Sequence, residues 1–186
     1  LLTVACGWLG LMAGSEGLVT AWLWSDPIVQ DIRWPRTAGA WLAGALLGLA
    51  GALAQGVFRN PLADPYLLGS ASGAGLGVAS ALALVSWGGA VISPGMDWVQ
   101  PWVSRLGLTG CAFVGAWGAV LITLILARGA HHSLRLLLSG VVVGVVLGAI
   151  TSLLMVAVPQ AWPVMQSFLL GSTAMMGMPS VVMMAW

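Results

Sequence analysis

Long runs without a charged residue dominate this sequence. The run from Thr37 to Val57 holds 21 uncharged residues. As a helix that rises about 1.5 Å per residue, it would be roughly 31 Å long, which matches a hydrocarbon core about 30 Å thick. Further uncharged runs extend from Leu67 to about Val85, from Leu106 to Ala127 and from Leu136 to Trp186. The last run holds 51 residues, more than one membrane crossing can use.

Composition points to the same class of protein. Hydrophobic residues make up 60% of the chain and charged residues only 6%. There are thus too few charged residues to cover the surface of a protein that is exposed to water. A transmembrane barrel would alternate in polarity along each segment, whereas these runs are continuous. The sequence therefore predicts an all-α, polytopic transmembrane helical bundle with about five to six spans. We expect residues 1–186 to form a single transmembrane domain.

Proline-containing polar segments separate the runs. The segment RNPLADP, residues 59–65, is short and stiff, and its prolines disfavour helix at Asn60 and Asp64. We expect it to turn the chain around at one membrane face. Residues 16–31 combine three acids with two tryptophans, a composition typical of a membrane interface. They are expected to form an extramembrane connection with a short amphipathic helix.

The second half of the chain follows the same plan. Residues 94–105 are expected to form an exposed loop, and RGAHHSLR, residues 128–135, is the next polar connection. Pro159 and Pro163 divide the last run into a fifth span, a helical segment from about Met165 and a further span that begins near Pro179. The segment QSFLLGSTAMMGM suits a short helix that dips into the membrane and faces protein or a water-filled cavity.

Both ends of the sequence lie inside apolar stretches. Leu1 to Ser15 is uncharged but short for a span, and Trp186 stops within another apolar stretch. We therefore expect a fragment truncated at both ends, with its first span clipped.

The charged residues exclude several functions. The six basic residues are all arginines and the net charge is +1, so neither a nucleic-acid surface nor a polybasic lipid-binding segment is expected. Without lysine there is no Walker A phosphate loop. Any ATP-driven step must take place on another chain.

Metal binding is not predicted. His131 and His132 are adjacent, so they cannot share a helix face as a metal pair does, and a solvated loop is the favoured interpretation. Six methionines near the end invite a Cu(I) interpretation, but methionine is more often a filler of apolar gaps. They are Met165, Met175, Met176, Met178, Met183 and Met184. Cys6 and Cys111 lie in separate apolar runs and behave as small hydrophobes.

Arg33 and Arg36 bracket Pro35 at the expected start of the second helix. A cation is mildly unfavourable at this end of a helix, so helix stability does not explain the pair. One interpretation is that both side chains extend to lipid headgroups or pair with Asp31. The other is that they dock acidic residues of a soluble partner, because arginine binds carboxylates in a bidentate fork.

Small residues recur every fourth position in three of the expected helices. Such faces let helix backbones approach closely in lipid, so we expect a compact bundle. The candidate packing glycines are Gly44 and Gly48 (with Ala40), then Gly69, Gly73 and Gly77, then Gly140, Gly144 and Gly148.

The stretch RWPR followed by GALLGLAGALAQGVFRNPLADPYLLGSASGAGLG resembles the membrane permease subunits of ATP-driven importers for iron–siderophore complexes, haem and vitamin B12, the FecCD/BtuC-like permeases. RLLLSGVVVG and FLLGSTAMM also match recurrent stretches of that family. The resemblance implies a permease that pairs with a second copy, sits on two ATPase subunits and receives ligand from a periplasmic or lipid-anchored binding protein. ATP and Mg²⁺ would bind the ATPase, and this chain would hold no cofactor.

The same resemblance implies roles for particular residues. In the family, arginines of the RxPR stretch meet glutamates of the binding protein at the outer face, and Arg33 and Arg36 occupy the matching positions. This sets RNPLADP inside, where the positive-inside rule gives a tie. Ser133, Leu134 and Arg135 would lie near the inner gate. The family's subunit has about twice as many spans, and its main ATPase contact lies in a later loop that is absent here.

The resemblance thus implies a multi-pass permease subunit in the bacterial inner membrane, not an enzyme, that imports ferric siderophores, or cobalamin or haem, by ATP-driven alternating access. A proton-coupled transporter is less favoured because no acid falls inside a span. A membrane scaffold that only assembles partners is the third hypothesis.

Overall fold

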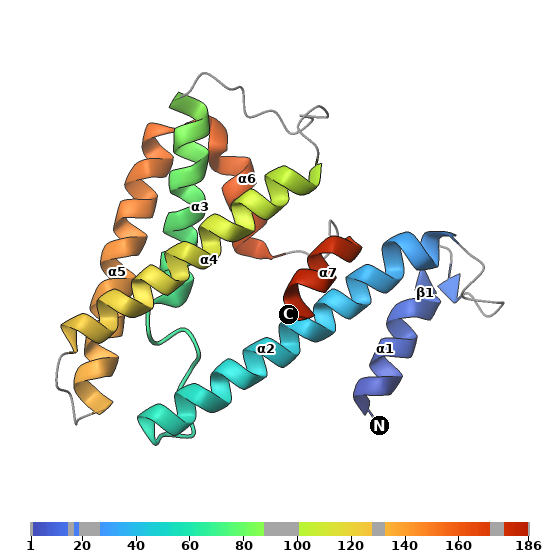
Figure 1. The fold of residues 1–186 in the computed structure, drawn as a ribbon, viewed down its shortest axis with the longest axis horizontal. Coiled ribbons are helices and arrows are strands. Elements are labelled where there is room, and N and C mark those ends of the chain that lie inside the picture. The colour runs from blue at the N-terminus through green and yellow to red at the C-terminus, as the bar shows by residue number, and fades with distance from the viewer. Residues whose placement is uncertain are drawn as a thin grey trace. The chain divides into compact units, whose positions relative to one another are not determined.

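The computed structural model describes residues 2–14, 17–18, 27–87, 101–127, 133–171 and 177–185, and long helices dominate it (Figure 1). Four helices are long and apolar enough to cross a membrane among these residues. They are α2, Trp34–Phe58; α3, Ser70–Trp87; α4, Pro101–Leu126; and α5, Ser133–Ala157. The predicted all-α transmembrane class is therefore confirmed.

Three shorter helices complete the described chain. They are α1, Leu2–Met12; α6, Trp162–Leu170; and α7, Met178–Ala185. α1 and α7 occupy the positions of the expected first and last spans, but with 11 and 8 residues each is shorter than a span. α6 begins at Trp162 and not near Met165, because Pro163 is tolerated in the first turn of a helix.

The start of α2 differs from the prediction. A π-helical turn, η2, covers Val29–Arg33 and continues directly into α2, with the Trp34 N–H donating to the Val29 oxygen. Helical backbone thus begins before Pro35, which has no N–H to donate, and the wider turn accommodates that missing donor. The two arginines therefore do not lie at an exposed helix start. Most of the connection predicted for residues 16–31 lies outside the described residues.

Two other helices begin at different residues from those predicted. α4 begins at Pro101, inside the loop expected for residues 94–105, because proline is favoured at the first helical position. α3 begins at Ser70 and not at Leu67, because Gly69 has a positive φ of 78° and closes the preceding turn.

A 3-10 turn, η3, covers Pro159–Ala161 and separates α5 from α6. Strands β1, Ala13–Gly14, and β2, Gly17–Leu18, form a short antiparallel ladder that was not predicted.

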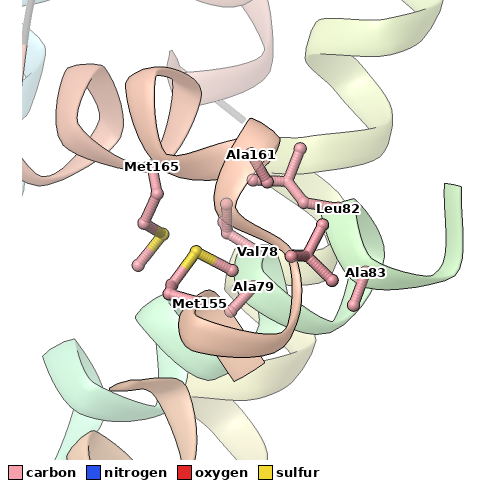
Figure 2. Close-up of a cluster of buried hydrophobic side chains, with 8 residues drawn as sticks. Val78, Ala79, Leu82, Ala83, Met155, Ala161 and Met165 are labelled. Carbon is pink, nitrogen blue, oxygen red and sulfur yellow. The ribbon is translucent and has the colours of Figure 1, made fainter. Parts of the chain in front are cut away.

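The chain divides into two compact units, residues 1–49 with 171–186, and residues 50–170. In the second unit α3, α4 and α5 pack together, with α6 and η3 against α3. Figure 2 shows its core, in which Met155 and Met165 lie beside Val78 and Ala79 of α3. Met165 is 1% exposed and Met155 4%. That residues 1–186 form a single domain stays a prediction.

A second buried cluster fixes the turn after α2. Ala54 and Phe58 from the end of α2 meet Ala63 from the RNPLADP turn, and four leucines pack around them. The leucines are Leu67 and Leu68 from the turn and Leu136 and Leu137 from α5. The end of α2, the turn and the start of α5 are therefore held together within the second unit.

Candidate functional site

Arg33 contacts the end of α1. Its Nη1 donates to the backbone oxygen of Leu11 at 3.2 Å and lies 3.5 Å from that of Met12. The last carbonyls of a helix lack partners within the helix, and a cation there also meets the negative end of the helix dipole. Both acceptors are backbone atoms, so the bonds that Arg33 makes here are not the pairing with Asp31 that was one of the alternatives. Arg33 is half-buried.

Close packing brings α1 to the first half of α2 in the same unit. A Cβ placed on Gly7 would lie 3.1 Å from the Trp41 ring, and one placed on Gly10 would lie 3.2 Å from the Thr37 hydroxyl. Both distances are shorter than ordinary contacts of about 3.5–4.0 Å. The two glycines therefore set how near α1 can come to α2. The hydrogen bond of Arg33 to the Leu11 oxygen lies at the end of this contact between the helices.

Arg36 is exposed and makes no hydrogen bond or ion pair in the part of the chain that the structure describes. It shares a hollow of about 710 Å³ with Arg33. Among the described lining residues there are two arginines and no acidic side chain, so this part of the hollow suits a carboxylate or another anion. The lining residues are Cys6, Gly10, Ala13, Ile28, Ile32, Arg33, Arg36, Thr37, Ala40 and Trp41.

Two of the predicted packing glycines lie where α3 touches α4. A Cβ on Gly73 would lie 3.0 Å from the carbonyl carbon of Gly115, and one on Gly77 would lie 2.8 Å from that of Cys111. Neither position can hold a side chain unless a backbone moves. Gly115 is equally close to Gly73 and Gly77 from the other side. The sequence analysis did not single out Gly115, although it belongs to a four-residue series of small residues with Cys111 and Ala119; only the series in which glycine recurs were selected.

Three more predicted glycines meet where the RNPLADP turn ends. A Cβ on Gly140 would lie 2.9 Å from the Leu67 carbonyl carbon and 3.1 Å from the Leu68 Cα. Gly144 lies one helical turn further on, near Gly69. The start of α5 is therefore in backbone contact with the residues that lead into α3.

The other three candidate glycines have open surroundings. A Cβ on Gly44, Gly48 or Gly148 meets nothing within 4 Å. They have no close helix neighbour among the described residues, so their role in packing stays a prediction. Any partner that they pack against would be another chain or a further part of this one.

Thr123 of α4 is a residue that the sequence analysis missed. Its side chain is fully buried, and its hydroxyl donates to the Leu68 oxygen at 3.0 Å, 55 positions away in sequence. The bond satisfies a carbonyl that lies before the first turn of α3. The only signal was a hydroxyl residue inside an apolar span, which more often bonds to its own helix.

The residues predicted to lie near the inner gate begin α5. Ser133 is its first residue, the Leu134 side chain is 65% exposed and Arg135 is exposed. They adjoin the buried cluster around Ala63 through Leu136 and Leu137, so they lie at the same end of the unit as the RNPLADP turn. His131 and His132 lie outside the described residues. Among the residues described, no group of three His, Cys, Asp or Glu side chains could hold a metal ion.

The RNPLADP turn is itself well ordered by side-chain bonds. The Asn60 Oδ1 accepts from the Leu62 N–H at 2.9 Å, and the Asp64 Oδ1 accepts from the Tyr66 N–H at 2.7 Å. The Leu62 side chain is 88% exposed at the turn. The turn therefore presents an apolar side chain outward from a backbone that two side-chain hydrogen bonds support.

Comparisons with known proteins agree in both sequence and fold. The model of the FecCD transport family matches residues 2–186. The vitamin B12 import system permease protein BtuC of Salmonella arizonae is 39% identical over 153 residues, 81% of this chain and 42% of that protein. BtuC of an Escherichia coli strain is 41% identical over 149 residues, 76% of this chain and 40% of that protein.

The fold also matches a solved transporter. A metal-chelate type ABC transporter in an inward-facing conformation superposes with a TM-score of 0.76 at 25% sequence identity, over 97% of this chain and 54% of that one. The chain thus spans less than half the length of these two curated relatives and about half of the solved chain.

Proposed function

Since the chain belongs to the FecCD transport family, we propose that it is part of the transmembrane permease of an ATP-driven importer for metal chelates in the bacterial inner membrane. The observation that carries the proposal is the family match over residues 2–186, joined to four helices of membrane-spanning length among the residues that the structure describes. The chain contributes a rigid part of the membrane pathway, and the pathway alternates between outward and inward access.

ATP is hydrolysed on separate ATPase subunits. The chain has no lysine for a phosphate-binding loop. The acids Asp31 and Asp64, which the structure describes, are exposed, and Asp64 is already bonded to the backbone of its own turn. Neither is placed to relay protons at membrane depth. These features support a transporter that is driven from another chain, with no cofactor of its own.

The substrate class is a bulky metal chelate. The resemblance to the family favours ferric siderophores as its commoner substrates, whereas the curated relatives at 39–41% identity are named for vitamin B12. Haem is the third member of the class. The groove along α3 and α4, about 680 Å³, has an apolar lining and offers no pattern of donors from which to choose. Specificity therefore resides in the binding protein.

The binding protein docks at Arg33 and Arg36 on the outer face. The support is the hollow that both residues line, in which the lining residues that the structure describes include no acid. Ser133, Leu134 and Arg135 lie near the inner gate. A second permease copy completes the pathway, and the open surfaces at Gly44, Gly48 and Gly148 are suited to close helix contacts with it or with the rest of the subunit.

The test is uptake by cells that express the full-length subunit with its ATPase and binding protein. Labelled ferric siderophore, haem and cobalamin are offered in parallel. Uptake of one of them that stops when the ATPase is inactivated supports the proposal and identifies the substrate. If none enters although all subunits are assembled, the metal-chelate class is wrong.

A further inference from the structure

Thr123 of α4 makes a hydrogen bond that leaves its own helix. Its side chain is fully buried, and its hydroxyl donates to the Leu68 oxygen at 3.0 Å. A hydroxyl residue inside an apolar helix more often bonds to the carbonyl four residues earlier in the same helix. Thr151 of α5 follows this rule, since its hydroxyl donates to the Leu147 oxygen at 2.9 Å. The bond of Thr123 instead ties α4 to a segment 55 positions away.

The segment that accepts this bond, Leu67–Leu68, also touches α5. A Cβ placed on Gly140 would lie 2.9 Å from the Leu67 carbonyl carbon and 3.1 Å from the Leu68 Cα. Both distances are shorter than ordinary contacts of about 3.5–4.0 Å, so no side chain fits between the two backbones. Leu67–Leu68 is therefore held by a hydroxyl of α4 and by the backbone of α5.

The contacts on this segment differ in what they fix. Apolar packing joins it to Leu136 and Leu137 of α5 through the buried cluster at Ala63. Such packing is non-directional, so it tolerates a small slide of the segment along α5. A hydrogen bond weakens steeply when its angle departs from the preferred range. The directional bond from Thr123 is therefore the contact that sets the register of the segment.

The register of Leu67–Leu68 decides where two exposed side chains lie. The RNPLADP turn leads into this segment, and its Leu62 side chain is 88% exposed. Leu134 is 65% exposed at the start of α5. It lies six residues before Gly140, which is about 9 Å along the helix. A slide of the segment past Gly140 would shift Leu62 relative to Leu134.

We propose that Thr123 is a positioning residue of the transport cycle: its hydroxyl fixes Leu67–Leu68 and thereby keeps the RNPLADP turn in register with the start of α5. This rests on the proposed function, in which the turn and the start of α5 lie at the inner end of the pathway. With the hydroxyl in place, both parts respond together when the partner ATPase hydrolyses ATP. Without it the turn slides against α5, and more ATP is hydrolysed for each chelate that is carried.

The first measurement is a distance within the full-length permease, assembled with its ATPase in lipid nanodiscs. Spin labels are attached at Leu62→Cys and Leu134→Cys in a parent that carries Cys6→Ala and Cys111→Ala and lacks all other native thiols. Labelled subunits are diluted with unlabelled ones, so that pulsed electron–electron resonance reports the distance within one subunit. The parent should give one narrow distance distribution. Thr123→Val should broaden it or add a second distance, and Thr123→Ser should restore the narrow distribution.

Thr151→Val is the matched control, because it removes the same hydroxyl from a helix in which the bond stays within the helix. It should leave the distance distribution as it is in the parent. Thr123→Ala also removes the donor to the Leu68 oxygen and takes the place of Thr123→Val if the valine variant does not fold.

The second measurement is the number of chelate molecules transported per ATP hydrolysed, in proteoliposomes with the unlabelled protein. The probe is the one of labelled ferric siderophore, haem and cobalamin that cells take up. This ratio does not depend on the amount of folded protein, so a purely stabilising role of Thr123 would leave it unchanged. Thr123→Val should lower the ratio by about fivefold, the shift expected from the loss of one hydrogen bond. Thr123→Ser should keep it within about twofold of the wild type.

The proposal requires both changes. A Thr123→Val variant that keeps either the narrow distance distribution or the wild-type ratio would overturn it and leave the proposed function intact. A Thr151→Val variant that broadens the distribution as much as Thr123→Val would also overturn it, because the bond to Leu68 would then have no special effect. A fully assembled wild type that carries no chelate would remove the proposed function together with the role in transport, whereas the distance measurement still decides whether Thr123 sets the register.

Discussion

Replacing Gly140 by alanine tests one of the tightest backbone contacts in the second unit. The new Cβ would lie 2.9 Å from the Leu67 carbonyl carbon and 3.1 Å from the Leu68 Cα. Ordinary contacts between carbons are about 3.5–4.0 Å, so the turn must withdraw by at least about 0.6 Å. Its other side is held by the hydrogen bond from Thr123 to the Leu68 oxygen. A shift of the turn therefore disturbs that bond as well.

The expected cost follows from these terms. Overpacking against a neighbour that cannot move freely costs about 1–3 kcal/mol, and weakening one hydrogen bond adds about 1 kcal/mol. Alanine favours a helix over glycine by up to about 1 kcal/mol, which acts in the opposite direction. Gly140→Ala should therefore lower the free energy of unfolding by about 1–3 kcal/mol.

Gly148→Ala is the matched control, because it makes the same change in the same helix at a site where a Cβ meets nothing within 4 Å. It should be neutral or stabilising by up to about 1 kcal/mol. Unfolding of the full-length permease by SDS in mixed micelles, followed by tryptophan fluorescence, measures both variants, since this stretch alone supplies 11 tryptophans. A Gly140→Ala variant as stable as the wild type would refute the contact between α5 and the turn.

Three further predictions concern other contacts. Thr123→Val removes the donor to the Leu68 oxygen and should lower the free energy of unfolding by about 1–3 kcal/mol in the same titration. Thr123→Ser keeps a hydroxyl and is the control. Equal stability of Thr123→Val and wild type would contradict the role of the bond. Met165→Ala removes most of a side chain that is 1% exposed and should lower the free energy of unfolding by about 2–5 kcal/mol. Met165→Leu should lower it by less than about 1.5 kcal/mol. A larger loss of stability for leucine than for alanine would contradict the packing of Met165. Reversing both charges with Arg33→Glu and Arg36→Glu should weaken docking of the binding protein by about tenfold or more and leave membrane insertion unchanged, as binding and topology assays can check; undiminished docking would remove the assignment.

The fold class could be predicted because the membrane limits the choices. An uncharged run such as Thr37 to Val57 has little alternative to a spanning helix. Helix ends were less predictable, because proline permits two outcomes. Pro101 was taken as part of a loop, yet it begins α4, since a first helical residue needs no N–H donor. Pro35 was taken as an early residue of its helix and is the second residue of α2, but a π turn over Val29–Arg33 precedes α2 and runs directly into it.

The candidate site was predictable only in part, because contacts between helices depend on register. The four-residue interval singled out Gly73 and Gly140, but it could not show which neighbour they meet. Gly115 lies in a four-residue series in which its neighbours are Cys111 and Ala119 and not glycine, so it was passed over. Thr123 has no polar neighbour in sequence to suggest its bond. The bond of Arg33 to the end of α1 depends on how a helix 21 to 22 residues earlier folds back. No local pattern encodes that return.

The most direct test of the account uses proteoliposomes that contain the full-length permease and its ATPase. The binding protein, loaded with the chelate that cells take up, is added on the outer face of the permease, and ATP is supplied on the ATPase side. The account predicts transport that needs both ATP hydrolysis and the binding protein and that a proton gradient cannot replace. Transport driven by a proton gradient in the absence of ATP would contradict it.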